Sequence, residues 1–310
     1  MIQEILNAAL EYARPFIKDG KIADYIPELT KTDPNYLGAC VVDIKGTKYF
    51  AGDYTQQFTI QSISKTMTFL YALNKLGHKE VFKHVGMEAT GDAFNSIIRL
   101  EQNNGKPFNP MINAGAIAIS ALLEHNGVTF EEFLTFVRKI CHRDDITLNE
   151  GVYRSESLTG DRNRALAYIQ KACGNIEGDV PRALDFYFKT CSISCNCEDL
   201  AYYSSLLANG GKDVVTGEQI LNPTHVKVTK TIMVTCGLYD GSGGFAMRVG
   251  MPGKSGVGGG IIASCEKTLG IAAFSPALDV NGNSCGAYKI MSFMSEKLGL
   301  HYFSEIERKI

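Results

Sequence analysis

The sequence lacks long apolar runs, an excess of charge of either sign, and internal repeats. No apolar run approaches the roughly 20 residues that a membrane-spanning helix needs, and the start from Met1 to Asn7 lacks the basic-then-apolar order of a signal peptide. The 31 basic and 33 acidic residues leave a formal charge of −2. The sequence therefore lacks the excess of positive charge that binding to nucleic acid or an anionic membrane requires. We therefore expect a cytoplasmic globular protein with a small, uncharged or zwitterionic ligand.

The cysteine pattern contains no recognisable disulfide or metal framework. The nine cysteines are odd in number. Those in apolar stretches are typical of reduced core thiols: Cys40, Cys141, Cys173, Cys236, Cys265 and Cys285. Cys191, Cys195 and Cys197 are close enough to suggest a metal site, but paired zinc ligands usually have two or more residues between them, and no His lies nearby. We expect neither a metal nor a cysteine nucleophile.

Blocks of helical and strand patterns alternate along the 310 residues. Apolar spacing and turn residues predict one helix within 2–17, strands at 37–43 and 48–53 leading to 58–60, and a series of later helices: 114–125, 130–141, 162–172, 181–190 and 197–208. Short apolar stretches bounded by Gly, Pro and Ser then predict three more strands and a last helix: 245–250, 255–263 and 269–274, followed by 287–298.

This order of elements predicts an α+β protein. Strands occur near both chain ends, so we expect one antiparallel sheet flanked by helices, with an all-helical part inserted between its two strand groups. The expected division is a sheet-containing domain from 1–75 and 215–310 and a helical domain from 76–214, with the active site between them. A chain of 310 residues with 45% hydrophobic content can fill such a core.

The segment Gln61–Leu73 carries the first candidate catalytic pair. Ser62 and Lys65 are three apart, so on a helix they share a face, and a buried amine beside a hydroxyl can act as its base. The pattern S-x-x-K is weak alone, since roughly one match is expected by chance in a chain of this length, and two exposed polar residues remain an alternative. Ser264 and Lys267 form a second match, but it falls where a strand should turn.

A glycine-rich segment from Gly253 to Ile262 is the second candidate. It fails as a phosphate loop because Arg248 occupies a required glycine position, and as a nucleophile elbow because Val257 occupies another. It fits the K-[ST]-G strand of penicillin-recognising serine enzymes, which follows S-x-x-K after a long insertion. Close backbone packing is the alternative explanation of its glycines. Tyr239, in a glycine-rich turn just before this strand, is well placed to move a proton or simply to pack.

Taken together, these motifs resemble those of the serine-dependent glutaminases of the β-lactamase-like fold. The resemblance covers nearly the whole chain and includes further segments: Ala23–Pro27, Asn109–Ala116, Ser155–Glu156, Gly160–Asn163, Leu184–Phe188, Gly237–Tyr239 and Lys254–Gly260. It implies hydrolysis of L-glutamine to L-glutamate and ammonia without a metal or organic cofactor, commonly by a homo-oligomer, here a dimer or tetramer.

The resemblance also implies roles for individual residues. Ser62 would be the nucleophile, Lys65 its general base, and Tyr239 a catalytic and substrate-contacting residue. The substrate pocket would be completed by the following positions: Tyr25, Asn113, Glu156, Asn163, Tyr187 and the backbone at Val257. Glutamine carries an ammonium, a carboxylate and an amide, so it needs an acidic acceptor such as Glu156, polar donors, and an oxyanion hole, which we place at the N–H groups of Ser62 and Val257.

A neutral Lys65 is a requirement of this chemistry. Burial and the nearby ammonium of Lys254 should both lower its pKa, which predicts activity that rises toward alkaline pH. Two other functions fit the same motifs. One is a β-lactamase or transpeptidase, a serine amidase that acts on a cyclic or peptide amide, and the other is a non-catalytic amino-acid sensor.

Overall fold

The computed structural model describes residues 1–90, 97–305 and 308 of the chain. The strands are β1 (Gly38–Asp43), β2 (Lys48–Gly52), β3 (Phe58–Thr59), β4 (Thr147–Leu148), β5 (Ile193–Cys195), β6 (Gly253–Ser255), β7 (Gly260–Cys265) and β8 (Leu269–Phe274). The helices are α1 (Ile2–Ala13), α2 (Ser64–His84), α3 (Ile98–Gln102), α4 (Asn113–His125), α5 (Phe130–Cys141), α6 (Glu150–Thr159), α7 (Asp161–Ala172), α8 (Val180–Cys191), α9 (Cys197–Ala208), α10 (Pro223–Cys236), α11 (Ser242–Arg248) and α12 (Cys285–Leu298). Short 3-10 helices are η1 (Arg14–Asp19), η2 (Pro27–Lys31), η3 (Gln61–Ile63) and η4 (Tyr239–Gly241).

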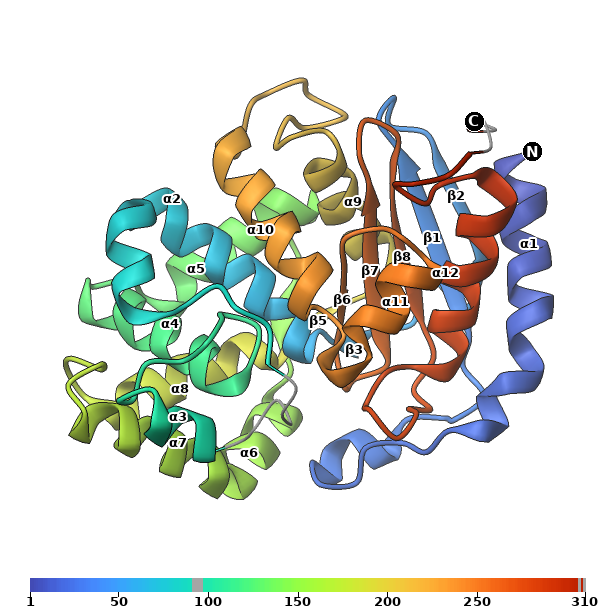
Figure 1. The fold of residues 1–310 in the computed structure, drawn as a ribbon. Helices are drawn as coiled ribbons and strands as arrows, with labels where there is room; N and C mark the ends of the chain where they lie inside the picture. The colour runs from blue at the N-terminus through green and yellow to red at the C-terminus, as the bar shows by residue number, and fades with distance from the viewer. Residues whose placement is uncertain (91–96, 306–307, 309–310) are drawn as a thin grey trace.

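The larger sheet is built from both parts of the chain, as the sequence predicts. Its five strands lie in the order β2-β1-β8-β7-β6, and each neighbouring pair is antiparallel. Helices α1 and α12 pack against each other beside this sheet, and a group of helices forms the other half of the molecule (Figure 1). The prediction of an α+β fold with an antiparallel sheet flanked by helices is confirmed.

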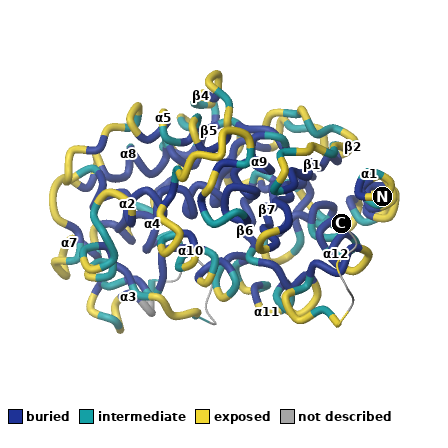
Figure 2. Tube along the Cα trace, turned by 90° about the horizontal axis from the view of Figure 1, so that it is seen from above, coloured by how far each residue is buried: buried dark blue, intermediate teal, exposed yellow. Residues whose placement is uncertain are grey.

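Helices cover both faces of the central strands. On β1, Ala39 and Val41 belong to the cluster that includes the buried faces of α1 and α12. Their neighbours Cys40 and Val42 belong to the cluster that includes α2 and α9. Successive side chains of a strand point to opposite faces, so β1 is buried throughout. Figure 2 shows these strands and the adjoining helix segments as the dark interior, with exposed residues gathered at loops and outer helices.

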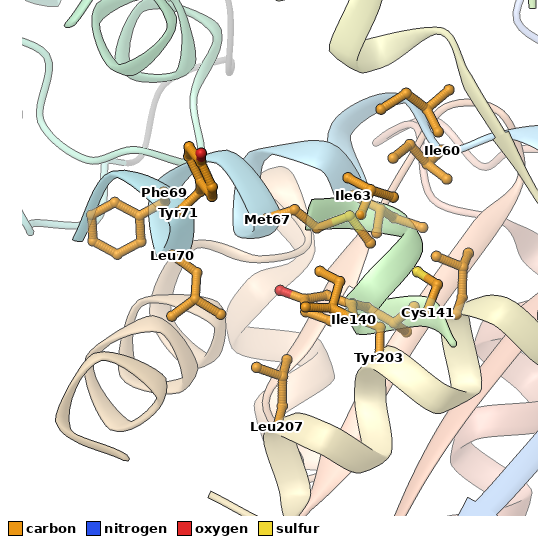
Figure 3. Close-up of a cluster of buried hydrophobic side chains, with 14 of the residues drawn as sticks. Ile60, Ile63, Met67, Phe69, Leu70, Tyr71, Ile140, Cys141, Tyr203 and Leu207 are labelled. Carbon is orange, nitrogen blue, oxygen red and sulfur yellow. The ribbon is translucent and has the colours of Figure 1, made fainter. Parts of the chain in front are cut away.

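Helix α2 runs through the centre of the helical half. Every residue from Ser64 to Leu73 is buried. Figure 3 shows side chains of α2 meeting those of α5 and α9 in one cluster, which includes Met67 and Tyr203. Helix α2 is interrupted at Gly77, whose φ of 79° and ψ of 164° are not helical. The first turns of α2, which carry Lys65, are therefore fixed by packing on all sides.

Most predicted helices are confirmed to within a residue or two: α4, α5, α7, α8, α9 and α12. The prediction of a strand at 245–250 is wrong, because these residues belong mainly to α11. In a strand, residues 245, 247 and 249 would share one face. Phe245 and Val249 are buried while Met247 is 69% exposed, which is the spacing of a helix.

The predicted strand at 255–263 is divided into two. Strand β6 ends at Ser255, a turn follows, and β7 begins at Gly260. Within the turn Gly259 has a φ of +101°, a conformation that glycine adopts without strain. The sequence prediction also missed α6 and α10, although Asn222 and Pro223 form a typical N-terminal signal for α10. Cys173 is exposed, so its assignment to the core is wrong.

Every helix in the described part of the chain falls short of the length and apolar character that crossing a membrane requires.

Candidate active site

Ser62 and Lys65 lie at the point where the second, smaller sheet leads into α2. Strand β3 ends at Thr59, Ser62 sits in η3, and Lys65 falls in the first turn of α2. The preceding Gln61 has a φ of +47°, a left-handed conformation that costs free energy for a residue with a side chain. The chain therefore turns sharply just before the candidate nucleophile. Ser264, of the second S-x-x-K match, lies on β7 near its turn to β8 instead.

The Lys65 amine is held in a buried polar chain. Its Nζ donates to Asn113 Oδ1 at 2.6 Å, and Asn113 Nδ2 donates to Asn163 Oδ1 at 3.0 Å. Lys65 is 1% exposed. Burial lowers the pKa of Lys65 to about 8, since the charged amine loses its hydration. A substantial fraction of Lys65 is thus neutral near physiological pH, as a base requires.

The Ser62 hydroxyl is paired with Tyr239. The two hydroxyls share a hydrogen bond, the backbone of Val257 also bonds to the Tyr239 hydroxyl, and Tyr239 donates to Ser255 O at 3.3 Å. Burial raises the pKa of Tyr239, and the bonds to Ser62 and Val257 oppose that rise. Among the described residues there is no hydrogen bond between Ser62 and Lys65 themselves, so Tyr239 is the group that orients the hydroxyl.

Lys254 lies behind the Tyr239 ring as a second buried amine. Its Nζ donates to Gly237 O at 2.9 Å and to Ser255 O at 2.6 Å, and it lies 4.5 Å from the centroid of the Tyr239 ring. Burial lowers the pKa of Lys254 strongly, and the charge of Lys65 acts in the same direction. The repulsion between the two amines acts on the pKa of Lys254, whereas burial alone lowers the pKa of Lys65, so only the burial part of the expectation from the sequence is confirmed.

Glu156 supplies a carboxylate inside the site. It lies on α6 and is 7% exposed. Burial raises its pKa to about 7, while a hydrogen bond from Gln61 and the charge of Lys65 oppose that rise. An incoming ammonium group would lower this pKa and bind the ionised form. Gln61 thus connects the turn before Ser62 to the acidic group.

Cys191 belongs to the site, which the sequence did not indicate. Its thiol contacts the Tyr187 hydroxyl, and Ser64 Oγ donates to its Sγ at 3.9 Å. Burial raises the pKa of Cys191 to about 12, so the thiol is neutral. The neighbouring thiols point elsewhere: the free thiols of Cys195 and Cys141 share a hydrogen bond, and Cys197 Sγ donates to Gly38 O.

A cavity of about 300 Å³ joins these groups. Its lining includes seven residues expected from the sequence: Tyr25, Ser62, Asn113, Glu156, Asn163, Tyr187 and Val257. It also includes six that were not expected: Ile26, Gln61, Thr159, Gly160, Arg162 and Cys191. Lys65 and Tyr239 contact two lining residues, Asn113 and Ser62. Tyr25 is 54% exposed and lies where the cavity meets solvent. The residues come from both halves of the molecule.

This arrangement can carry out acyl transfer. It combines a buried hydroxyl, an amine that titrates near neutral pH, a phenol in contact with the hydroxyl, and a carboxylate for a cationic group. Within the described part of the chain, no group of three or more His, Cys, Asp or Glu side chains is arranged to hold a metal ion.

The sequence matches known proteins over almost its full length. A family model described as Glutaminase matches residues 20–303. The protein named Glutaminase 2 of Clostridium perfringens (strain 13 / Type A) is 47% identical over 305 residues, which cover 97% of this chain and 100% of that protein.

Solved structures show the same similarity. The crystal structure of a Bacillus glutaminase in 4.3 M NaCl superimposes with a TM-score of 0.89 at 38% identity, covering 97% of this chain and 99% of that one. The Bacillus subtilis glutaminase YbgJ has a TM-score of 0.86 at 35% identity, over 97% of this chain and 99% of that one. That protein forms a covalent complex with 5-oxo-L-norleucine after reaction with 6-diazo-5-oxo-L-norleucine.

Proposed function

Because the chain belongs to the glutaminase family, we propose that it hydrolyses the side-chain amide of L-glutamine through an acyl-enzyme on Ser62. In the first half-reaction neutral Lys65 accepts the Ser62 proton, and Ser62 Oγ bonds to the amide carbon. The C–N bond then breaks, and ammonia leaves with a proton delivered by way of Tyr239. In the second, water adds to the ester carbon, the bond to Ser62 breaks, and the proton returns to Ser62.

The hydrogen bonds of the site support separate roles for Lys65 and Tyr239. Tyr239 already shares a bond with Ser62, and Lys65 is held by Asn113. In the proposed mechanism substrate takes over the hydrogen bonds of Asn113, which lets the Lys65 amine turn toward Ser62. Tyr239 then remains beside the oxygen that attacks and is placed to protonate the leaving nitrogen.

Substrate recognition follows from the groups that line the cavity. Glu156 accepts the α-ammonium group, and the polar side chains of Tyr25, Asn113, Asn163 and Tyr187 bind the α-carboxylate and the amide. The backbone N–H groups of Ser62 and Val257 form the oxyanion hole, because Val257 lies in the turn that meets η3. The observation that carries this proposal is the buried Lys65 amine, 1% exposed and 2.6 Å from Asn113 Oδ1, three residues after the cavity-lining Ser62.

Replacement of Ser62 tests the nucleophile directly. Ser62→Ala should retain less than about 1% of the turnover of L-glutamine, because the covalent route is lost. Ser264→Ala is the matched control, since Ser264 belongs to the second S-x-x-K match and its buried hydroxyl has no hydrogen-bond partner among the described residues; it should retain full activity. A Ser62→Ala enzyme with more than a few per cent of turnover contradicts the assignment.

The same assays separate the alternatives. Release of ammonia from L-glutamine, compared with L-asparagine and with hydrolysis of the chromogenic cephalosporin nitrocefin, distinguishes a glutaminase from a β-lactamase-like amidase. Binding without ammonia release indicates an amino-acid sensor. The covalent modification of the YbgJ relative by a diazo ketone analogue supports a reactive nucleophile in this cavity.

We also propose a compartment, an assembly and a domain division for the protein. The nine free cysteines are compatible with the reducing cytoplasm, and the family resemblance implies a homo-oligomer, which light scattering on the purified protein would measure. The proposed division places 1–75 and 215–310 in the sheet-containing domain and 76–214 in the helical domain. Two helices would join the domains: α2, which this division cuts at residue 75 although it packs within the helical half, and α9, which belongs to the inserted segment but packs on β8 and β1.

A further inference from the structure

Two histidines face each other where α2 packs against α10, outside the catalytic site. His78 lies on α2 just after the break at Gly77, and His225 lies in the first turn of α10. Their ring centroids are 4.8 Å apart, and the ring planes are inclined by 55°. Because α2 and α10 are in contact, the two rings bridge one helix–helix junction.

Each ring has a nitrogen that can donate an electron pair to a metal ion. His225 Nδ1 lies 2.6 Å from Asn74 Oδ1, and since an amide oxygen can only accept, Nδ1 carries the proton and Nε2 keeps its lone pair. His78 Nε2 is buried and has no hydrogen-bond partner among the described residues. A buried polar atom without a partner is costly, and such an atom needs an explanation.

We propose that His78 and His225 bind one divalent transition-metal ion of the zinc class and thereby link α2 to α10. Two imidazoles that share a tetrahedral ion with metal–nitrogen bonds of about 2.0–2.1 Å have ring centroids about 5 Å apart, close to the separation seen here. Asn74 supplies the outer hydrogen bond that usually orients a metal-binding histidine. Water completes the coordination.

With two protein ligands the site should bind with modest affinity. It lies about 20 Å along α2 from Lys65, given the helical rise, so the bound ion should act on stability rather than on the reaction itself.

Cobalt binding to the full-length protein tests this site. Titration with CoCl₂, followed by visible absorption and thermal unfolding, should show one bound ion and a higher Tm. His78→Gln and His225→Gln should each weaken the affinity by about tenfold or more. Asn74→Ala should weaken it less. His125→Gln is the control, because that surface histidine pairs with Glu177 and lies away from the site; it should bind cobalt like the unmodified protein.

The readouts distinguish this site from binding at thiols or anywhere else. Thiolate coordination adds intense near-ultraviolet absorption, which histidine coordination lacks, and prior alkylation with N-ethylmaleimide should leave the cobalt signal unchanged. Circular dichroism and metal-free glutaminase activity should be unaltered in the histidine variants, which shows that they fold. Equal affinity in all variants, a thiolate spectrum, or no binding by the unmodified protein would each overturn the proposal.

Discussion

At the scale of single residues, the proposed mechanism requires two groups of the site to be in particular charge states. In that mechanism Lys65, whose pKa burial lowers to about 8, is neutral, and Glu156, whose pKa burial raises to about 7, is ionised. Both conditions are met only at alkaline pH. We expect log kcat/KM to rise steeply below about pH 7, more gently to about pH 8, and then to level off.

A pH–rate profile on the folded enzyme measures these two steps. In Glu156→Gln the lower step should disappear while the upper one remains, because only Lys65 still titrates. A profile that is flat or falling from neutral to about pH 9 would exclude Lys65 as the base.

Gln61 links the turn before the nucleophile to the acidic group. Its side chain donates to Glu156 and helps to hold that pKa down. Gln61→Ala should therefore raise KM near neutral pH by about fivefold, the value of one hydrogen bond of ~1 kcal/mol. The difference should shrink at alkaline pH, where Glu156 is ionised in both proteins.

Gln61→Gly separates the side chain from the backbone in this test. Glycine relieves the strain of the positive φ at this position but removes the same hydrogen bond. The two variants should show the same pH-dependent change in KM. A KM ratio that does not vary with pH would mean that Gln61 acts through the backbone instead.

The sequence predicted the candidate reacting residues but not every residue that lines the cavity. Ser62 and Lys65 were proposed from the spacing of a motif, and Tyr239 from the resemblance to the glutaminases. Cys191 and Arg162 line the cavity only because α8 and the start of α7 reach it. In the sequence Cys191 lies close to Cys195 and Cys197. In the structure the three thiols point to different surroundings. Such positions depend on tertiary packing, which local patterns do not encode.

At the scale of elements, the N-terminus of α9 has a complete capping box. Asn196 Oδ1 accepts from Asp199 N at 3.0 Å, and Asp199 Oδ2 accepts from Asn196 N at 2.8 Å. Because α9 packs on the sheet, Asn196→Ala should lower the free energy of unfolding by about 1 kcal/mol. Urea unfolding measures this change. Asn7→Ala on the exposed face of α1 is the control and should stay within about 0.5 kcal/mol; equal effects would contradict the capping role.

The elements that the sequence predicted wrongly share one cause. The segment 245–250 has apolar residues at both strand and helix spacing. The helix α11 is distinguished only in the structure, where Phe245 and Val249 are buried and Met247 is exposed. The sequence pattern of the glycines after Ser255 is likewise compatible with a strand. In the structure Gly256 N donates to Gly260 O, and this hydrogen bond closes a turn. Short apolar segments are ambiguous by period alone, whereas the longer periodic helices were predicted closely.

At the scale of the whole molecule, the order of strand and helix blocks was enough to predict a sheet made from both chain ends. The order of these blocks did not predict how the residues of the two halves are arranged around the cavity. Ser62 and Val257 stand on one side, and Asn113, Glu156 and Asn163 come from helices of the other half. A ligand that contacts both sets should therefore hold the halves together, and its binding should be visible in global stability.

Thermal unfolding of the Ser62→Ala protein tests this coupling without turnover. At about 100 times its dissociation constant, L-glutamine should add about 2.7 kcal/mol to the free energy of unfolding, and so raise Tm by several degrees. D-glutamine presents its ammonium group to the wrong side of the cavity and should give a much smaller shift. Adding Glu156→Gln to Ser62→Ala should abolish most of the shift with L-glutamine, because the ammonium then loses its only carboxylate among the lining residues of the cavity. A shift that survives in the double variant would place the ligand somewhere other than between the two halves.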